Sequence, residues 1–145
     1  MDAIDLLRRD HRDLERLVAE FDEAKSDKEL AELFVRIRAK LLAHAEADLR
    51  VFYPAIKSAA ADEIKRSAKD YIEIAKILKE LHFNDDRFDE RFLVLKFMIR
   101  DHIDADESVD GVLDIARARL EPGELVQMAQ KIVGVEQTVR GDKAA

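Results

Sequence analysis

The chain has 145 residues, of which 48% are hydrophobic and 39% charged, with four glycines, two prolines and no cysteine. This composition favours one all-helical domain with a single core, and the lack of cysteine excludes disulfides, thiolate ligands and iron–sulfur clusters. The net charge of −7 argues against a nucleic-acid-binding protein, because such proteins need a basic face.

No apolar run in the sequence reaches the roughly 20 residues that a membrane-spanning helix needs. The start of the chain, Met1 to Asp5, also lacks the basic region and the apolar stretch of a signal peptide. We therefore expect a cytoplasmic location, with no nucleic-acid partner and no membrane partner.

The first half of the chain predicts two long amphipathic helices. Apolar side chains recur in steps of three and four over residues 2–25, which is the spacing of one helix face. Ser26 and Glu29 predict a capping box that begins a second helix, which runs to about Ile56. The inward row of this second helix consists of Leu30, Leu33, Ile37, Leu41, His44, Asp48 and Val51.

The second half predicts two more helices of the same kind. Asp62 is a good N-cap for the third helix, and the segment Asn84-Asp85-Asp86 breaks the pattern and caps the fourth. The inward row of the fourth helix consists of Phe88, Phe92, Leu95, Ile99, His102, Asp106, Val109, Leu113, Ala116 and Leu120.

Long helices joined by short loops predict an all-α fold, an antiparallel up-down-up-down four-helix bundle over residues 1–120. Pro122-Gly123 ends the bundle, and residues 121–145 are predicted to form a short additional C-terminal helix and a frayed tail from Arg140. That helix is expected to lie across the bundle or to support a homodimer or another protein partner. Its apolar face consists of Leu125, Met128, Ile132 and Val135.

Two matching polar motifs interrupt the apolar rows. His44 to Asp48 and His102 to Asp106 both read His-x-x-x-Asp, 58 residues apart. Residues i and i+4 share one helix face, so each motif points an imidazole and a carboxylate inward. Such groups are costly to bury unless they are paired, hydrogen-bonded or bound to a metal, and two copies in one small domain predict a metal site.

His11 and Tyr71 extend this set to a layer of six. Asp10-His11 corresponds to Asp70-Tyr71 at an offset of 60 residues, so each helix pair contributes one such marker and one His-x-x-x-Asp motif. Antiparallel pairing brings these positions to similar heights in the bundle. Nitrogen and oxygen donors without sulfur suit iron, manganese or zinc, and bridging carboxylates favour two non-haem irons.

The sequence resembles the hemerythrin-like (HHE cation-binding) family over roughly residues 2–118. The resemblance rests on His-Ala-Glu-Ala-Asp-Leu-Arg-Val-Phe-Tyr-Pro at 44–54 and on Asp-Ala-Ile-Asp-Leu-Leu-Arg-Arg-Asp-His at 2–11. It implies a four-helix bundle with a non-haem di-iron centre. Members of this family bind dioxygen or nitric oxide, sense oxygen or iron, or handle peroxide.

Three of the six ligand positions depart from the family pattern. Asp48 and Asp106 stand where the family has glutamate, and Tyr71 stands where a histidine is expected. The family's aromatic-proline pair after the fourth-helix motif is also absent, and Asp110-Gly111-Val112 occupies that place.

These departures leave two interpretations open. In one, Tyr71 ligates ferric iron as a phenolate, and Glu107 or Tyr53 supplies a further oxygen. In the other, the centre has decayed to one metal or none, and a hydrogen-bonded Asp–His–Tyr core remains. Glu107 is otherwise expected to be a solvated or supporting residue.

The resulting expectation is a non-haem, two-iron centre that binds or senses dioxygen, nitric oxide or peroxide. The predicted metal ligands are His11, His44, Asp48, Tyr71, His102 and Asp106. The alternative is a metal-free regulatory or protein-interaction module on the same bundle. Turnover of peroxide is a third option, although no separate substrate pocket or acid–base pair is evident in the sequence.

Overall fold

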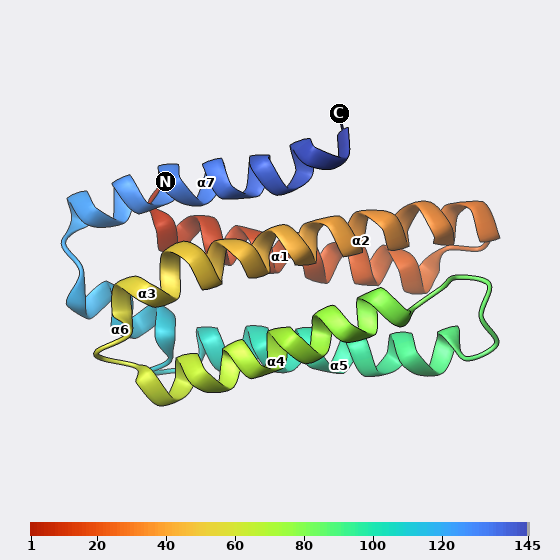
Figure 1. The fold of residues 1–145 in the computed structure, drawn as a ribbon, viewed down its shortest axis with the longest axis horizontal. Helices are drawn as coiled ribbons and strands as arrows, with labels where there is room; N and C mark the ends of the chain where they lie inside the picture. Colours follow the sequence, from red (N-terminus) through yellow and green to blue (C-terminus); the bar gives the residue numbers. More distant parts are fainter. Residues whose placement is uncertain (145) are drawn as a thin grey trace.

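A computed structural model describes residues 1–144, and its regular structure is helical throughout this range (Figure 1). Long helices form the bundle, a short helix closes one end, and a last long helix lies outside. In chain order the elements are α1 (Ala3–Glu23), α2 (Asp27–Ala47), the π-helical turn η1 (Asp48–Phe52), α3 (Tyr53–Ile56), α4 (Ala61–Glu80), α5 (Phe88–Glu107), α6 (Val112–Arg119) and α7 (Pro122–Ala144).

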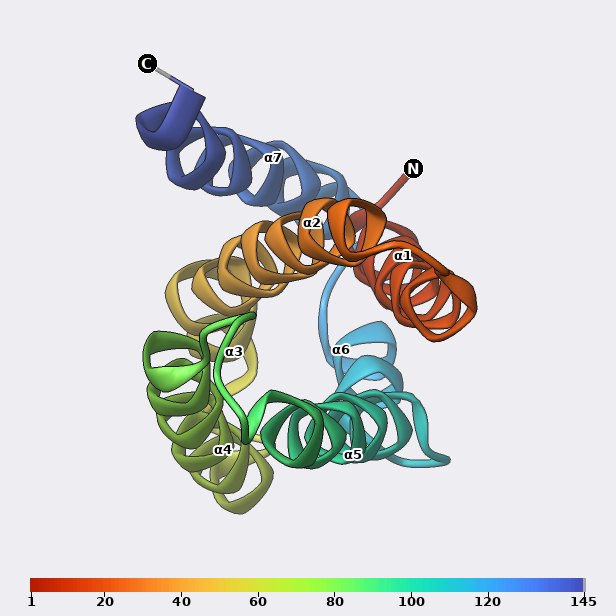
Figure 2. The same ribbon diagram turned by 90° about the vertical axis from the view of Figure 1, so that its right-hand side faces the viewer.

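The four long helices α1, α2, α4 and α5 surround one apolar interior, each antiparallel to the next in the chain (Figures 1 and 2). The predicted all-α, up-down-up-down bundle is therefore confirmed. Apolar residues at helical spacing are buried because that face of each helix is the one turned toward the others. Its fully or almost fully buried members include Leu7, Leu14, Ile37, Leu41, Ile74, Leu78, Leu95 and Ile99.

The sequence predicted one continuous α-helix to about Ile56. The structure instead interrupts the second helix with the π-helical turn η1. The backbone N–H of Tyr53 bonds to the carbonyl of Asp48, five residues earlier. Pro54 follows directly, and a proline has no N–H and crowds the carbonyl four residues before it. The extra residue rotates the helix after Asp48, and Tyr53 is buried in the bundle together with Asp48.

The fourth helix is shorter than predicted, because α5 ends at Glu107. Asp110 has a φ of 61°, and Gly111 packs so closely that a Cβ there would lie 2.6 Å from the carbonyl oxygen of Ala105. This turn separates α6 from α5 and leaves Val109, predicted to point inward, 87% exposed. The apolar row then resumes on α6, where Leu113 is buried.

Two predicted helix starts differ in detail. Only half of the predicted Ser26–Glu29 capping box forms: the Ser26 side chain accepts a hydrogen bond from the backbone N–H of Glu29 at 3.2 Å, and no return bond from the backbone N–H of Ser26 to the Glu29 side chain is present among the described residues. The third helix begins earlier than its predicted N-cap suggests, because Ala60 rather than Asp62 precedes α4. The predicted cap of the fourth helix by residues 84–86 is wrong, because the N-cap of α5 is Arg87; Asp85 lies in the turn before it and accepts from the backbone N–H of Arg87 at 2.9 Å.

The C-terminal helix α7 is much longer than the short helix predicted, with 23 residues. It also continues through the segment from Arg140 that was expected to fray, as far as Ala144, and Ala145 lies outside the described residues. Figures 1 and 2 show α7 lying on the outer side of α1 and α2. The face that it presents to them includes the buried residues Leu125, Met128, Ala129, Ile132 and Glu136.

The apolar face of α7 is therefore already covered by this chain's own bundle. Among residues 1–144, no helix combines the length and the apolar character needed to cross a membrane.

Candidate metal centre

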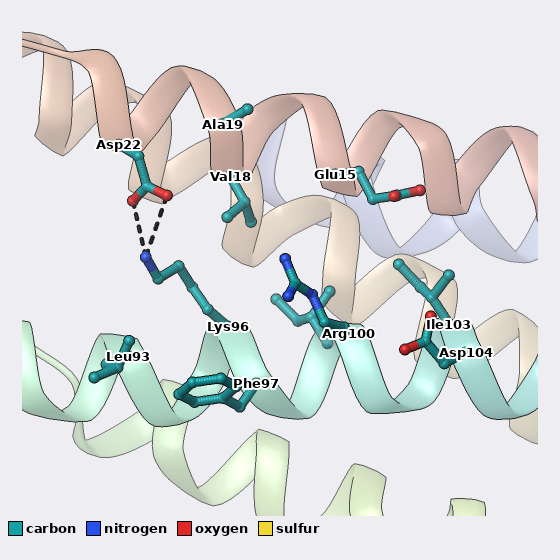
Figure 3. A pocket seen from close by; sticks show the side chains of 11 residues that line it. Glu15, Val18, Ala19, Asp22, Leu93, Lys96, Phe97, Arg100, Ile103 and Asp104 are labelled. Atoms are coloured by element: carbon teal, nitrogen blue, oxygen red, sulfur yellow. Dashed lines mark hydrogen bonds and ion pairs between the residues drawn. The ribbon is translucent and has the colours of Figure 1, made fainter.

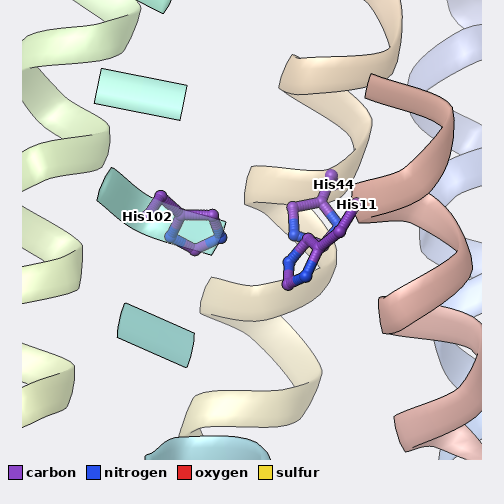
Figure 4. Close-up of side chains that lie close together, drawn as sticks. All are labelled: His11, His44 and His102. Atoms are coloured by element: carbon purple, nitrogen blue, oxygen red, sulfur yellow. The ribbon is translucent and has the colours of Figure 1, made fainter. Parts of the chain in front are cut away.

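Three buried imidazoles from three helices converge near the middle of the bundle (Figure 4). His11 comes from α1, His44 from α2 and His102 from α5. Their ring centroids are 4.9 Å apart for His11 and His44, 5.4 Å for His11 and His102, and 5.6 Å for His44 and His102. Ring nitrogens of all three lie within 4.8 Å of one another, close enough to hold one metal ion.

Two carboxylates and a phenol complete this polar layer, which we define as His11, His44, Asp48, Tyr71, His102 and Asp106. Asp48 Oδ2 lies 3.2 Å from His44 Nε2 and 3.6 Å from His102 Nε2. Asp106 Oδ2 lies 3.4 Å from His102 Nε2. The structure thus brings together all six residues that the sequence singled out, while their ligation of a metal stays a prediction.

The tyrosine hydroxyls connect the carboxylates to the rest of the layer. Tyr71 donates a short hydrogen bond to Asp48 Oδ2, and its oxygen lies 2.9 Å from His102 Nε2. Tyr53, which the π-helical turn directs inward, donates to Asp106 Oδ2 at 3.2 Å.

Two of the imidazoles are hydrogen-bonded, through the ring nitrogen that faces away from the layer, to carboxylates outside the layer. His11 Nδ1 lies 2.6 Å from Glu107 Oε2, and His44 Nδ1 lies 3.0 Å from Asp10 Oδ2. A carboxylate can only accept, so Nδ1 carries the proton in each ring and Nε2 faces the layer. This arrangement, with a carboxylate on the far nitrogen, is the one that fixes the orientation of metal-binding histidines.

Three buried polar atoms of the layer have no hydrogen-bond partner within the described part of the chain. They are His11 Nε2, His44 Nε2 and Asp48 Oδ1. Leaving such groups buried and unsatisfied is costly, so their presence together calls for an explanation. Two imidazole nitrogens and a carboxylate oxygen are also a donor set that binds divalent transition metals. The residues present therefore fit a metal ion.

Burial and charge set the protonation of the imidazoles. Burial lowers the pKa of His11, and it lowers the pKa of His102 to about 3, so both rings are neutral. Burial would also lower the pKa of His44, but the charge of Asp48 and the hydrogen bond to Asp10 outweigh it and raise the pKa to about 10. In the metal-free chain His44 is therefore a cation between two carboxylates.

The two aspartates of the layer behave differently from each other. Burial would raise the pKa of Asp48, but the positive charge of His44 dominates and lowers it. Burial and the nearby negative charge of Asp48 raise the pKa of Asp106 well above its usual range. Burial and the same Asp48 charge raise the pKa of Tyr71, so its phenol is protonated in the metal-free chain.

Comparison with known proteins identifies the family. The family model described as the hemerythrin HHE cation binding domain matches residues 2–111. The chain belongs to the hemerythrin HHE cation-binding domain family. The resemblance expected from the two sequence segments is thereby confirmed, and the buried histidines and carboxylates of this hemerythrin-like chain lie where they can bind a cation.

A solved structure shows the same fold. The crystal structure of a hemerythrin HHE cation-binding domain-containing protein from Mycobacterium kansasii has a TM-score of 0.77 to this chain, with 16% sequence identity. The match covers 98% of this chain and 89% of that one, so it includes the outer helix α7.

A curated relative is a DNA nickase from Nostoc sp. (strain PCC 7120), 26% identical over 112 residues. The match takes in 74% of this hemerythrin-like chain but only 32% of the relative, so the chain spans about a third of the length of that protein.

The sequence did not reveal the supporting residues on α1, α2 and α7. Asp10, which was noted only as the neighbour of His11, also accepts a hydrogen bond from Lys40 Nζ at 2.7 Å. Glu136 on α7 is buried beside Asp10, and burial with that neighbouring carboxylate raises the pKa of Glu136 to about 8. A signal for Glu136 was present, because it continues the four-residue spacing of the apolar face after Ile132.

Glu107 is a supporting residue in this structure rather than a member of the layer, which agrees with its principal expected role. Besides His11, it pairs with Arg12, and it lies 3.5 Å from Arg8. The hydrogen bond from His11 lowers the pKa of Glu107, so it is ionised. Its negative charge favours the Nδ1–H form of His11, which leaves the lone pair of Nε2 toward the layer.

A surface groove of about 480 Å³ lies between α1 and α5 (Figure 3). Lys96 spans it, with its Nζ 3.0 and 3.2 Å from the two carboxylate oxygens of Asp22. Val18, Phe97 and Ile103 supply part of its apolar lining. The lining includes none of the six layer residues, so the groove is separate from the candidate centre.

Proposed function

We propose that this hemerythrin-like chain binds non-haem iron in its polar layer and uses an open coordination position to bind a small ligand. The expected ligands of the metal are drawn from the layer, and the small ligand is dioxygen, nitric oxide or peroxide. The iron would supply reversible binding or one-electron chemistry, and this chain's own residues would orient the metal and exclude water.

One observation carries the proposal: His11 Nε2 is buried without a hydrogen-bond partner among the described residues, and His44 Nε2 has only the ion-pair contact of 3.2 Å with Asp48 Oδ2. Their Nδ1 atoms are fixed by Glu107 and Asp10, so both Nε2 atoms are aimed into the layer. Imidazoles held in this way are arranged for metal coordination before any metal arrives. The absence of cysteine restricts the donors to nitrogen and oxygen, which suit iron.

The burial of the layer supports a small ligand. His11 and His44 have no exposed surface, and His102 is 6% exposed. An organic substrate of ordinary size would need these helices to separate, whereas a diatomic gas or peroxide is small enough for local side-chain motion to admit it. Binding or sensing is therefore favoured over turnover of a larger substrate.

The metal-free alternative also has an observation in its favour. The cationic His44 lies between Asp10 and Asp48, and Lys40 Nζ lies 2.7 Å from Asp10 Oδ1, so two positive charges balance the two carboxylates without any metal. In that case the layer would serve stability alone, and function would lie on the surface of the bundle.

Metal content separates the two functions. We expect the purified chain, expressed with added iron, to contain iron by mass spectrometry, and His44→Ala to lose it. The matched control is His82→Ala, since His82 is exposed just beyond the end of α4 and outside the layer. Circular dichroism checks that each variant remains helical. Iron at background level in the folded wild-type chain would refute the proposal.

A second readout tests the open position. Nitric oxide added to the iron-loaded, reduced chain should produce an iron–nitrosyl absorption band, and the band should be absent in His44→Ala. An iron-loaded chain that shows no spectral change with nitric oxide, dioxygen or peroxide would refute the ligand-binding part of the proposal.

A further inference from the structure

We propose that the chain forms a two-fold symmetric dimer in which the exposed face of α4 in each copy packs against the exposed face of α5 in the other. The proposal does not depend on metal binding. It rests on two stripes of surface residues that have the same spacing along their helices and opposite charge.

The exposed face of α4 carries a basic stripe with an apolar residue at its centre. This α4 stripe consists of Lys65, Lys69, Ile72, Lys76 and Lys79, all exposed. Steps of four and three place them along one side of the helix over about 21 Å. Ile72 is 69% exposed, and in the described part of the chain only other lysines form ion pairs. Four unpaired positive charges around an exposed apolar side chain, in a chain of net charge −7, indicate a surface for a complementary partner.

The exposed face of α5 carries a stripe of the same spacing and the opposite charge. This α5 stripe consists of Glu90, Val94, Phe97, Asp101 and Asp104, all exposed. Val94 is 49% exposed and Phe97 is 57% exposed, and Figure 3 shows Phe97 and Asp104 along the outer side of α5. The apolar residues lie in the middle, as Ile72 does on α4, and carboxylates lie at both ends.

The two stripes match position by position when they are laid antiparallel. The pairs are Lys65 with Asp104, Lys69 with Asp101, Ile72 with Phe97, Lys76 with Val94 and Lys79 with Glu90. Three lysines thus meet carboxylates, the two central apolar side chains meet each other, and the methylene stem of the fourth lysine can cover a valine. The exposed charges that flank the stripes are of both signs: Asp62, Arg66, Glu73, Glu80 and Arg100.

A two-fold axis parallel to the helices creates both matches at once. Because α4 and α5 are antiparallel neighbours in the bundle (Figures 1 and 2), this rotation places α4 of a second copy antiparallel to α5 of the first, and the reverse. The rotation shifts nothing along the helices, so residues keep their heights. Tyr71 and His102 meet inside the bundle at 2.9 Å, which places Ile72 within about one turn of Phe97 in height.

A second copy fits these faces better than an anionic membrane or an acidic peptide. Either of those would use the α4 stripe alone and leave Phe97 and Val94 of α5 in water, whereas a second copy covers both faces. The homodimer expected from the sequence used the C-terminal helix. This proposal places it on α4 and α5, because the bundle already covers Leu125, Met128 and Ile132 of α7.

Sedimentation velocity over a range of chain concentrations measures the dimer. We expect a shift from monomer to dimer as the concentration rises, and a weaker dimer at high salt, because the proposed charge pairs lie at the surface. A chain that stays monomeric at every concentration would overturn the proposal. Binding of that monomer to vesicles containing phosphatidylserine would assign the α4 stripe to a membrane surface instead.

Charge reversal tests the pairing itself. Lys69→Glu and Asp101→Lys each place like charges opposite one another twice in the symmetric dimer, so each should weaken dimerisation about tenfold or more. Mixing the two variants should restore the dimer, since every such position then faces an opposite charge. Circular dichroism checks that both remain helical.

The matched control is Lys131→Glu, which reverses an exposed lysine of α7 outside both stripes and should leave the dimer unchanged. An equal loss of dimer in this control would overturn the placement on α4 and α5. A mixture of Lys69→Glu and Asp101→Lys that stays monomeric would overturn the proposed pairing.

Discussion

Metal binding to the proposed centre should displace one proton, and the proton should come from His44. Two neighbouring carboxylates, Asp48 and Asp10, raise the pKa of this imidazole to about 10, against an ordinary 6.5. The pKa values of His11 and His102 are lowered by burial, so neither ring has a proton to release near neutral pH. A metal that binds His44 Nε2 must therefore compete with a single proton.

The size of the effect follows from this competition. Below a pKa of about 10, the apparent affinity for the metal rises tenfold with each pH unit when one proton is displaced. Raising the pH from about 6.5 to about 8 should therefore strengthen binding by about 30-fold, or about 2 kcal/mol. Metal affinity rises with pH because the pKa of His44 is raised: the protonated imidazole repels the metal and blocks Nε2, and a higher pH removes this proton.

Calorimetric titration measures both quantities. Zinc serves as a redox-inert probe, and titrations in two buffers of different ionisation enthalpy count the protons released. We expect about one proton per ion at neutral pH. Asp10→Asn removes the negative charge beside His44 Nδ1 and should lower both the proton count and the pH slope. A proton count near zero, with an affinity that does not change with pH, would refute the assigned charge of His44.

Three further predictions concern stability and are measured by thermal or denaturant unfolding. Gly111→Ala places a Cβ 2.6 Å from a carbonyl oxygen of α5 and should lower the free energy of unfolding by about 1–3 kcal/mol. Gly134→Ala, whose added Cβ meets no atom within 4 Å in α7, should raise the free energy of unfolding by up to about 1 kcal/mol. Similar effects in the two variants would contradict the packing argument. Burial and the neighbouring carboxylate of Asp10 raise the pKa of Glu136 to about 8, so the folded chain binds the Glu136 proton more tightly than the unfolded chain, and the free energy of unfolding should fall as the pH rises from about 4.5 to about 8. Glu136→Gln should remove this part of the pH dependence. Identical pH profiles in the wild-type chain and the variant would count against the raised pKa. Val109→Ser should change the free energy of unfolding by less than about 0.5 kcal/mol, since Val109 is 87% exposed, and a loss of several kcal/mol would place that side chain in a core.

Helical periodicity was sufficient to predict the bundle because it reports which side chains share one face. His44 and Asp48 lie in the same row as Ile37 and Leu41, and the structure buries all four of these side chains. The same reasoning placed His102 correctly on α5. Periodicity measures only the angle around a helix, so it identified these inward side chains without any knowledge of the partners they would meet.

Periodicity failed where the backbone leaves the α-helix. The row of the fourth helix continues in register through Val109, yet the chain turns at Asp110, which adopts a left-handed φ of 61°. In the second helix the turn before Pro54 widens to a π-helical one, and this brings Tyr53 into the layer. Both changes occur over a few residues, which is too short a stretch to alter an average spacing.

The supporting contacts were also beyond the reach of the sequence. Glu107 meets His11 across 96 residues of chain, and Asp10 meets His44 across 34. Such contacts depend on how far one helix slides along another, and no local pattern carries that displacement. The length of α7 was underestimated for a related reason, because its hydrophobic face is interrupted by Glu136, whose burial beside Asp10 depends on the packed bundle.

The sequence by itself determined the helical class, the inward rows and the six residues of the polar layer, since each depends on spacing along one helix. Only the tertiary structure decided which atoms of that layer are open. Tyr71 of α4 meets Asp48 of the π-helical turn, and His11 Nε2 and Asp48 Oδ1 are left without a hydrogen-bond partner among the described residues. Hydrogen-bond satisfaction depends on positions in space to within a few tenths of an ångström, which the order of residues along a chain does not specify.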